Sequence, residues 1–325
     1  MTYEPPPCPP WLLDCYPSIT PEFQWVFTNN ATKEPHWISS MGPQTWMLLC
    51  PYDEILVGGR RGGGKSAGLI AWFAMGDLSL EDDDPARATY LNDPYYRGLI
   101  LRKESSANVE FIDECRDFFR PFNCKAVDDP VRFEFNTDKT GKPGAIIYTN
   151  HLNNTEAFEK YRGWGITKIG IEELVQIESE GSYLRLLGSL RGKKQQRIVN
   201  GKSRALLRCQ ILSTTNPDGP GASWVKARFV KAQSKGVQIP WNTPFRSPVS
   251  GLSRIFIPMR LQENPYLRDN KQYLSMLLEQ SPTKQRQWID GDWDAAAGKF
   301  FVDFRPDGPI GEKEMAETPW ACHVI

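Results

Sequence analysis

One octapeptide constrains this 325-residue chain more than any other feature of its sequence. Residues 59–66 read Gly-Arg-Arg-Gly-Gly-Gly-Lys-Ser, which fits the pattern G-x-x-x-x-G-K-[ST] at every required position. An apolar run at 54–57 precedes the motif and a helical pattern over 65–76 follows it. In that setting glycines let backbone N–H groups turn inward around phosphate oxygens, and the helix N-terminus adds positive potential. The motif therefore predicts a nucleotide-phosphate site.

The residues of this loop have separate expected roles. Lys65 is predicted to reach the β and γ phosphates of ATP, and the Ser66 hydroxyl to bind Mg²⁺. A glycine-rich turn with a chance Lys-Ser pair is the alternative, which the strand and helix on either side disfavour. The predicted cofactor-binding residues of the loop are Gly59, Arg60, Gly62, Gly63, Gly64, Lys65 and Ser66.

Strands and helices alternate along the chain beyond residue 54. Strands are expected at 54–57, 98–102, 131–135, 145–148, 168–171 and 209–213, and helices at 65–76 and 105–119. The third and fourth of these strands are expected to form a hairpin. The alternation predicts an α/β fold with a mostly parallel sheet covered by helices. The length predicts one large domain with a smaller attachment.

Two adjacent acids end one of these strands. Glu172 and Glu173 follow Ile169-Gly-Ile, which places the first acid near the metal and the second near the γ-phosphate, poised to orient or deprotonate water. Kinases of this loop type often lack the second acid, so the pair favours hydrolysis. The first acid is usually Asp, so Glu172 binds the metal either directly or through water. An exposed acid pair at a strand end is the alternative.

Composition excludes several classes of protein. Lys plus Arg and Asp plus Glu number 39 each, so any surface for a polyanion is local. No apolar run approaches the ~20 residues that span a bilayer, and the Pro-rich start does not resemble a signal peptide. The seven cysteines form no CxxC pair and the three histidines are far apart, which predicts reduced thiols, a cytosol-like compartment and no zinc site.

One segment carries a local excess of basic residues. The stretch from Arg191 to Arg208 holds no acid, and two glycines indicate a loop or hairpin. Such a cluster suits contact with DNA phosphates, with a solvated basic face or a subunit contact as the alternative. The acidic run Glu81–Asp84 is expected to be a solvated loop. The basic residues are Arg191, Lys193, Lys194, Arg197, Lys202, Arg204 and Arg208.

Several motifs in order resemble the large terminase subunit of tailed double-stranded DNA phages, from about Trp37 to Val324. Gly42-Pro43-Gln44 resembles the family's adenine-contacting segment, and Arg61 matches an arginine common in its phosphate loop. Tyr161-Arg162-Gly163 precedes the acidic strand, as in many members. The stretch 212–221, Leu-Ser-Thr-Thr-Asn-Pro-Asp-Gly-Pro-Gly, resembles the coupling motif. Glu263-Asn264-Pro265 and residues 288–293 resemble the end of the ATPase region.

The resemblance implies a RecA-like P-loop ATPase core with a small lid. It implies an arm at 1–40, the core at 41–225, a remaining core strand and lid at 226–290, and a linker at 291–325 toward a nuclease domain that this sequence does not include. Asp303 and Asp307 are expected to be loop residues. The implied catalytic residues are Glu173, Arg61, Lys65, Asn216 and Thr215, with Gln44 contacting the base, Ser66 and Glu172 at the metal, and Arg102 or Arg162 as a finger from a neighbouring subunit.

The resemblance also implies a function and partners. The chain is expected to hydrolyse ATP with Mg²⁺ and to drive double-stranded DNA into a procapsid, in the cytoplasm of an infected bacterium. Expected partners are the portal protein, the small terminase subunit and further copies in a ring, with a monomer in isolation as the alternative. A helicase-type ATPase and a nucleotide-switched binding module without motor activity are the competing functions.

Overall fold

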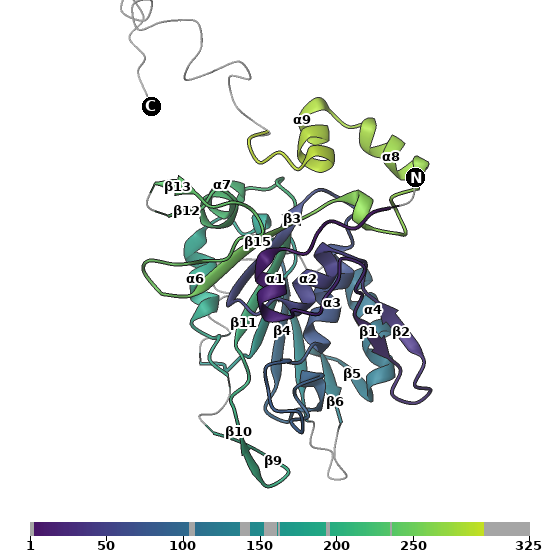
Figure 1. Cartoon of the computed structure of the whole chain (residues 1–325), viewed down its shortest axis with the longest axis vertical. Coiled ribbons are helices and arrows are strands. Elements are labelled where there is room, and N and C mark those ends of the chain that lie inside the picture. The colour runs from purple at the N-terminus through teal and green to yellow at the C-terminus, as the bar shows by residue number, and fades with distance from the viewer. Residues whose placement is uncertain are drawn as a thin grey trace, which may run out of the picture. The chain divides into compact units, whose positions relative to one another are not determined.

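A nine-stranded sheet organises the residues that the computed structural model describes, which are 3–103, 108–136, 144–152, 161, 163–192, 196–234 and 236–295 (Figure 1). The strand order is β14-β15-β3-β11-β8-β4-β7-β6-β5. Its strands are β14 (Phe245–Arg246), β15 (Ser253–Met259), β3 (Glu54–Gly59), β11 (Gln210–Thr215), β8 (Lys168–Ile171), β4 (Arg97–Arg102), β7 (Ile146–His151), β6 (Val131–Phe135) and β5 (Cys124–Asp128).

Six adjacent strands, from β15 to β7, pair in parallel, and the edge strands pair antiparallel. Three separate two-stranded ribbons are β1 (Val26–Thr28) with β2 (Pro35–Ile38), β9 (Arg197–Val199) with β10 (Lys202–Arg204), and β12 (Gln233–Ser234) with β13 (Val237–Gln238). The helices are α1 (Pro10–Cys15), α2 (Pro43–Leu49), α3 (Lys65–Ala74), α4 (Asn108–Phe119), α6 (Glu180–Leu187), α7 (Ala222–Val225), α8 (Lys271–Leu278) and α9 (Pro282–Gln285).

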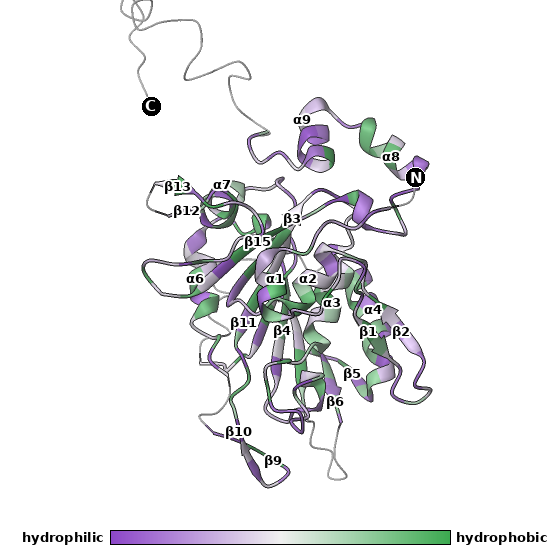
Figure 2. Cartoon of the chain, in the orientation of Figure 1, coloured by the Kyte–Doolittle hydropathy of each residue, from purple (hydrophilic) through white to green (hydrophobic). Residues whose placement is uncertain are grey.

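Helices cover both faces of the sheet, because successive side chains of a strand point to opposite faces. In β3, Ile55 and Val57 join the core under α2, α3 and α4, whereas Leu56 joins the core under α6 and α7. Figure 2 colours this strand and the helices around it by hydropathy. Gly170 of β8 lets α3 approach, since a Cβ there would lie 2.5 Å from the ring of Phe73.

The buried amine of Lys168 fixes the far end of α3. Its Nζ donates to the carbonyl oxygens of Trp72 and Met75, both at 2.8 Å, and lies 4.5 Å from the Trp72 ring centroid. These carbonyls lie at the end of α3, where the helix offers no N–H group one full turn further on. Burial lowers the pKa of Lys168 well below its usual value. Lys168 begins β8, so one side chain ties α3 to the strand that ends at Glu172.

The expected fold class is confirmed. The six predicted strands correspond to β3, β4, β6, β7, β8 and β11, and the expected hairpin is the antiparallel pair β6–β7. The predicted helices correspond to α3 and α4. Residues up to Ala295 form one compact unit, and the boundaries expected at 40, 225 and 290 stay predictions. Asp303, Asp307 and most of the expected linker lie outside the described residues.

The described residues also bear on the cysteines and on membrane crossing. The six cysteines among them are free thiols. No helix in the described part of the chain has the length and apolar character to span a bilayer.

We expect Lys168→Met to lower the free energy of unfolding by about 1–3 kcal/mol, because the carbonyl oxygens of Trp72 and Met75 each lose a buried hydrogen bond. Denaturant unfolding followed by circular dichroism measures the change. Lys125→Met, at an exposed position of β5, is the control and should change stability by less than about 0.5 kcal/mol. Equal stability of the two variants would contradict a capping role for Lys168.

Candidate active site

The phosphate-binding motif forms the turn between β3 and α3. Its backbone has positive φ at Gly59 (117°), Gly62 (78°) and Gly64 (83°), a region that side chains with a Cβ rarely adopt. Neighbouring side chains hold the turn from outside. The Gln44 amide donates to the carbonyl oxygen of Gly64 at 2.7 Å, and the Asn264 amide donates to that of Gly62 at 2.7 Å. The loop is thus held open by its own glycines and two amide side chains.

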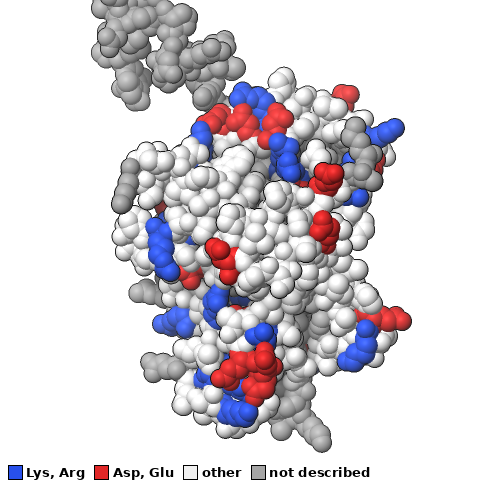
Figure 3. Space-filling model, viewed as in Figure 1, with Lys and Arg blue, Asp and Glu red and all other residues white. Residues whose placement is uncertain are grey.

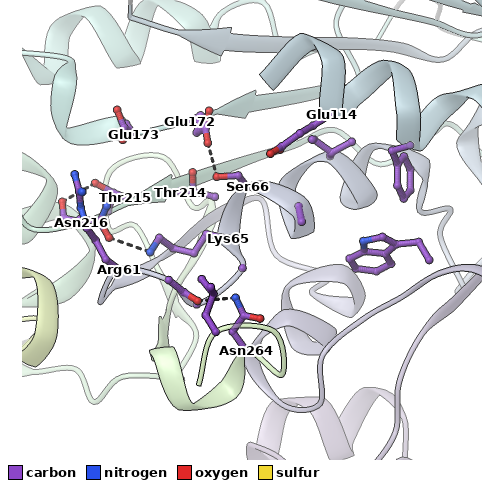
Figure 4. Close-up of a pocket in the computed structure, with 18 of the residues that line it drawn as sticks. Arg61, Lys65, Ser66, Glu114, Glu172, Glu173, Thr214, Thr215, Asn216 and Asn264 are labelled. Atoms are coloured by element: carbon purple, nitrogen blue, oxygen red, sulfur yellow. Dashed lines mark hydrogen bonds between the residues drawn. The ribbon is translucent and has the colours of Figure 1, made fainter. Parts of the chain in front are cut away.

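The loop lines a cavity of about 670 Å³, which is within the usual range for small-ligand sites (Figure 4). The cavity brings together residues from the ends of β8 and β11, from α4 and from the segment after β15. Beside the loop residues 61–67, its lining includes His36, Trp37, Ile70, Glu114, Asp117, Phe118, Glu172, Glu173, Thr214, Thr215, Asn216, Asn264, Leu267 and Tyr273.

Lys65 lies buried in this cavity. Its Nζ donates to the carbonyl oxygen of Arg60 at 2.5 Å and to Oδ1 of Asn216 at 2.9 Å. Burial, aided by the charge of Arg61, lowers the pKa of Lys65 to about 8 against the opposing effect of Glu172 and Glu173. A buried amine with a depressed pKa is a group that an anionic phosphate would stabilise in its charged form.

Ser66 and Glu172 contact each other across the cavity. The Ser66 hydroxyl donates to one carboxylate oxygen of Glu172, and Arg102 Nε lies 2.5 Å from the other. Burial raises the pKa of Glu172, and Arg102 and Ser66 oppose that shift. A hydroxyl beside a carboxylate is an oxygen donor set that suits Mg²⁺, which takes one or two protein ligands together with phosphate oxygens and water. The described residues contain no cluster of three His, Cys, Asp or Glu side chains that could hold a metal without a ligand's help.

Glu173 has an unusual backbone. Its φ of 56° and ψ of 57° are left-handed, which is uncommon for a residue other than Gly, Asn or Asp. Such strain often occurs at functional sites. The residue lines the same cavity as Glu172, although the two are neighbours in sequence (Figure 4). The left-handed turn after β8 therefore brings both acids to one cavity.

The end of β11 lies between β3 and β8. Asn216 accepts from Lys65, as described above. The Thr215 hydroxyl donates to the carbonyl oxygen of Asn216 at 2.9 Å and accepts from the Val175 N–H at 3.4 Å. Thr215 thus holds the turn that follows Glu173 through the backbone. The catalytic roles that the resemblance implies for Thr215 and Asn216 stay predictions.

The two arginines of the loop face different ways. The Arg61 guanidinium stacks 3.6 Å from the Trp288 ring centroid, and the Arg61 N–H donates to the Trp288 carbonyl oxygen at 2.9 Å. The Arg60 Nε donates to the carbonyl oxygen of Asp290 at 3.2 Å, and its side chain lines another cavity. Arg61 therefore lies beside the candidate phosphate space, while Arg60 contributes its carbonyl to Lys65.

Gln44 supports the phosphate loop from outside the cavity. It is buried, and its Oε1 accepts from the Ser40 N–H at 2.5 Å while its amide holds Gly64. It is not among the residues that line the cavity. The described position gives Gln44 the role of a support for the loop, and the direct contact with a base stays a prediction.

The expected finger residues have different outcomes. Arg102 pairs with Glu172 of its own chain and its side chain is 17% exposed, so its expected action on a neighbouring subunit is not supported. The reason is that the Arg102 side chain forms an ion pair with the buried Glu172, which follows the adjacent strand β8. Arg162 lies outside the described residues.

Several residues of the basic segment pair with acids, and the expected contact of the segment with DNA phosphates stays a prediction. The side chain of Arg197 is 1% exposed and pairs with Asp84 and Asp93 at 2.6 and 2.5 Å. Arg204 pairs with Glu81 and Asp83, and Lys202 with Asp83. The expected solvated acidic loop is thus the anchor of β9 and β10, and Figure 3 shows acidic and basic atoms mixed at the foot of the view.

The remaining basic residues of this segment either have other polar partners or lie outside the described residues. Arg208 pairs with Asp77 at 3.1 Å, and Arg191 donates to the carbonyl oxygen of Gly163 at 2.7 Å. Lys193 and Lys194 lie outside the described residues. A count of basic residues in one segment could not reveal acids that lie about 100 positions away in sequence.

Sequence reasoning missed several residues of the cavity. Trp37 and Phe118 form an aromatic wall with ring centroids 6.0 Å apart, and Glu114 of α4 extends toward Ser66 (Figure 4). No local motif marks these positions. Trp288 and Asn264 belong to stretches that the sequence singled out for their resemblance, but their contacts with the loop depend on tertiary structure.

The comparisons with known proteins agree with this architecture. No family model and no curated protein matched the chain. Among solved structures, the large terminase of a thermophilic bacteriophage in complex with ADP is similar, with a TM-score of 0.50, 14% identity, and coverage of 78% of this chain and 53% of that chain. The same terminase with ATP-gamma-S has a TM-score of 0.49, 14% identity and the same two coverages of 78% and 53%.

Another similar structure is the large terminase ATPase domain of Thermus phage P74-26. Its TM-score is 0.43 and its identity 13%, and the match covers 77% of this chain and 97% of that one. This chain spans about half the length of the thermophilic-phage terminase chains. At 14% identity and a TM-score of 0.50, the likeness to the ADP-bound large terminase confirms the resemblance at the level of the fold.

We expect Arg197→Met to lower the free energy of unfolding by about 3–5 kcal/mol, because Asp84 and Asp93 then stay buried without a counter-charge. Thermal and denaturant unfolding measure the loss. Lys202→Met removes an exposed partner from the same hairpin and should leave the unfolding midpoint nearly unchanged. A fully stable Arg197→Met protein would show that the pairing is dispensable and reopen this hairpin as a functional surface.

Proposed function

We propose that this chain is an ATP-hydrolysing motor subunit that translocates double-stranded DNA into a viral procapsid. One observation carries the proposal: Lys65, Ser66, Glu172 and Glu173 line one cavity, on a fold shared with large terminases. A phosphate loop alone suits any nucleotide-binding protein. The second acid beside the first favours hydrolysis by water.

The loop and its lysine would bind the triphosphate. The backbone N–H groups of Gly62 to Gly64 would bind phosphate oxygens. Lys65 would add a positive charge, and its Nζ donates to a carbonyl oxygen and an amide oxygen. The similar terminase of the thermophilic phage was solved with ADP, which supports a nucleotide as the ligand here. On nucleotide binding, a phosphate oxygen would replace Asn216 Oδ1 as a hydrogen-bond acceptor for Lys65.

Mg²⁺ would be held by Ser66 and Glu172, and it would neutralise charge on the phosphate oxygens. Glu173 would orient the attacking water and accept its proton. The rigid left-handed backbone at Glu173 keeps that carboxylate at the cavity rather than along the strand. Arg61 lies beside the same space and would stabilise charge on the γ-phosphate after leaving Trp288.

A chain of contacts supports coupling between this site and the C-terminal helices. Asn216 contacts Lys65, and two residues later Asp218 pairs with Lys284 of α9 and accepts from the Trp288 indole N–H at 3.1 Å. The same Trp288 stacks on Arg61 of the loop. A change at the phosphates would therefore reach α9 by two short routes, as a motor requires.

DNA, the portal protein, the small terminase subunit and further copies in a ring are proposed partners, in the cytoplasm of an infected bacterium. The neutralised segment 197–208 argues that the main DNA contact lies elsewhere on the chain. A helicase-type ATPase and a nucleotide-switched binding module remain the competing functions. Phosphate release measured with and without duplex DNA separates them: a motor is stimulated by duplex DNA without separating its strands, and a switch module shows no sustained turnover.

We expect Lys65→Ala to reduce ATP hydrolysis at least about 100-fold, because the charge that faces the phosphates is lost. Steady-state phosphate release from purified protein measures it. Lys125→Ala, at an exposed position of β5, is the matched control and should keep the wild-type rate. Near-normal turnover of Lys65→Ala would show that another site performs the hydrolysis.

We expect Glu173→Gln to retain ATP binding and to lose about 10²–10⁴-fold in the rate of hydrolysis, because its amide cannot accept a proton. Equilibrium binding of a fluorescent ATP analogue and single-turnover hydrolysis separate the two effects. Glu178→Gln, whose side chain is 75% exposed, is the control. Parallel loss of binding and hydrolysis would assign Glu173 to structure or to the metal instead.

A further inference from the structure

Arg102 ends β4 directly beside the acidic strand. β4 and β8 pair in parallel with Leu101 opposite Ile171, and the Glu172 N–H donates to the Leu101 carbonyl oxygen at 2.9 Å. The next residue of each strand is therefore Arg102 on one side and Glu172 on the other. This adjacency is fixed by the backbone ladder, so the two side chains leave the sheet edge together.

The carboxylate of Glu172 accepts a hydrogen bond at one oxygen, and its other oxygen forms an ion pair that lacks hydrogen-bond geometry. One oxygen accepts from the Ser66 hydroxyl, and the other lies 2.5 Å from Arg102 Nε. The guanidinium of Arg102 is 5.2 Å from the ring centroid of Phe111 on α4, which limits its own freedom. The two side chains are 17% and 6% exposed, so water competes little for either of them.

The contacts of Ser66 and Arg102 with Glu172 matter because residue 172 is a glutamate and not an aspartate. Glutamate has one more rotatable bond than the aspartate usual at this position, so an unclamped Glu172 would reach several places in the cavity. The ion pair with Arg102 opposes this freedom, because it places a positive charge 2.5 Å from the outer oxygen.

We propose that Arg102 is a positioning residue for Mg²⁺, which fixes the Glu172 carboxylate against Ser66 so that a glutamate can serve where an aspartate is usual. The inference rests on the proposed function, since it assumes that Ser66 and Glu172 hold the metal. Partners that orient metal-ligating side chains affect metal affinity by about 10–100-fold in proteins. If positioning dominates, loss of Arg102 weakens metal binding. If charge repulsion between the guanidinium and the ion dominates, loss of Arg102 strengthens it.

Mn²⁺ provides a direct measurement, because its free concentration is followed by electron paramagnetic resonance. The full chain is titrated with Mn²⁺ in the presence of saturating ADP. We expect Arg102→Gln to weaken Mn²⁺ binding by about 10–100-fold. Binding of ADP in EDTA should stay close to wild type, since the loop that holds phosphates is unchanged. Arg116→Gln, on the exposed side of α4 where it pairs with Asp113 and Asp128, is the matched control.

A second substitution tests the geometry. Glu172→Asp shortens the acid by one methylene group and withdraws it from Arg102. Adding Arg102→Gln to Glu172→Asp should then weaken Mn²⁺ binding less than it does in the wild-type background. Equal effects of Arg102→Gln in both backgrounds would show that Arg102 does not act through the length of Glu172, and would overturn the proposal.

The remaining outcomes are also decisive. Unchanged or tighter Mn²⁺ binding by a folded Arg102→Gln protein would overturn the positioning role. If that variant does not fold, Arg102→Lys keeps the charge but loses the planar fork. Weaker Mn²⁺ binding by folded Arg102→Lys would then support the proposal, and wild-type affinity would contradict it. Failure of the wild-type chain to bind ADP or Mn²⁺ would instead overturn the proposed function.

Discussion

The parallel pairing of β3, β11 and β8 is the constraint on which the site depends. Thr215 lies opposite Gly58 and Ser213 opposite Ile171, so three strands from distant parts of the sequence end at one edge. The phosphate loop, the acid pair and Asn216 follow directly from those ends. Hydrophobic burial fixes this register, because a slip by one residue would exchange the two faces of every strand. The cavity therefore forms only when the core does.

Buried ion pairs are the second constraint, and they explain the balanced charge of the chain. Glu54 is fully buried and bonds Arg228 and Arg254, while Arg197 joins two buried acids. Each such charge needs a partner, since an unpaired buried charge costs several kcal/mol. Charges used in this way do not contribute to a surface field. Net charge and local charge runs consequently give little information about where this molecule meets a polyanion.

The sequence predicted features in which the determining residues are neighbours. The loop from Gly59 to Ser66 carries its own glycines, and the acid pair follows its own strand, so both were recognisable without tertiary structure. The ion pair between Arg102 and Glu172 was not recognisable, because Arg102 lies 70 positions earlier and approaches Glu172 only through the β4–β8 pairing. The bond from the Gln44 amide to the Gly64 carbonyl oxygen was likewise not recognisable, because the two residues meet only through tertiary structure.

The turn after β11 connects the two halves of the proposed mechanism. Asn216 accepts from Lys65, and Asp218 pairs with Lys284 and bonds Trp288, with one proline between them. The fixed φ of Pro217 removes one of the rotations that would otherwise absorb a movement of Asn216. Gln287 also donates to the Pro217 carbonyl oxygen at 3.2 Å, so residues 284–288 bond this turn at the adjacent residues Pro217 and Asp218. If a phosphate oxygen replaces Asn216 as the acceptor for Lys65, the resulting displacement of Asn216 is therefore transmitted to α9 and the residues that follow it.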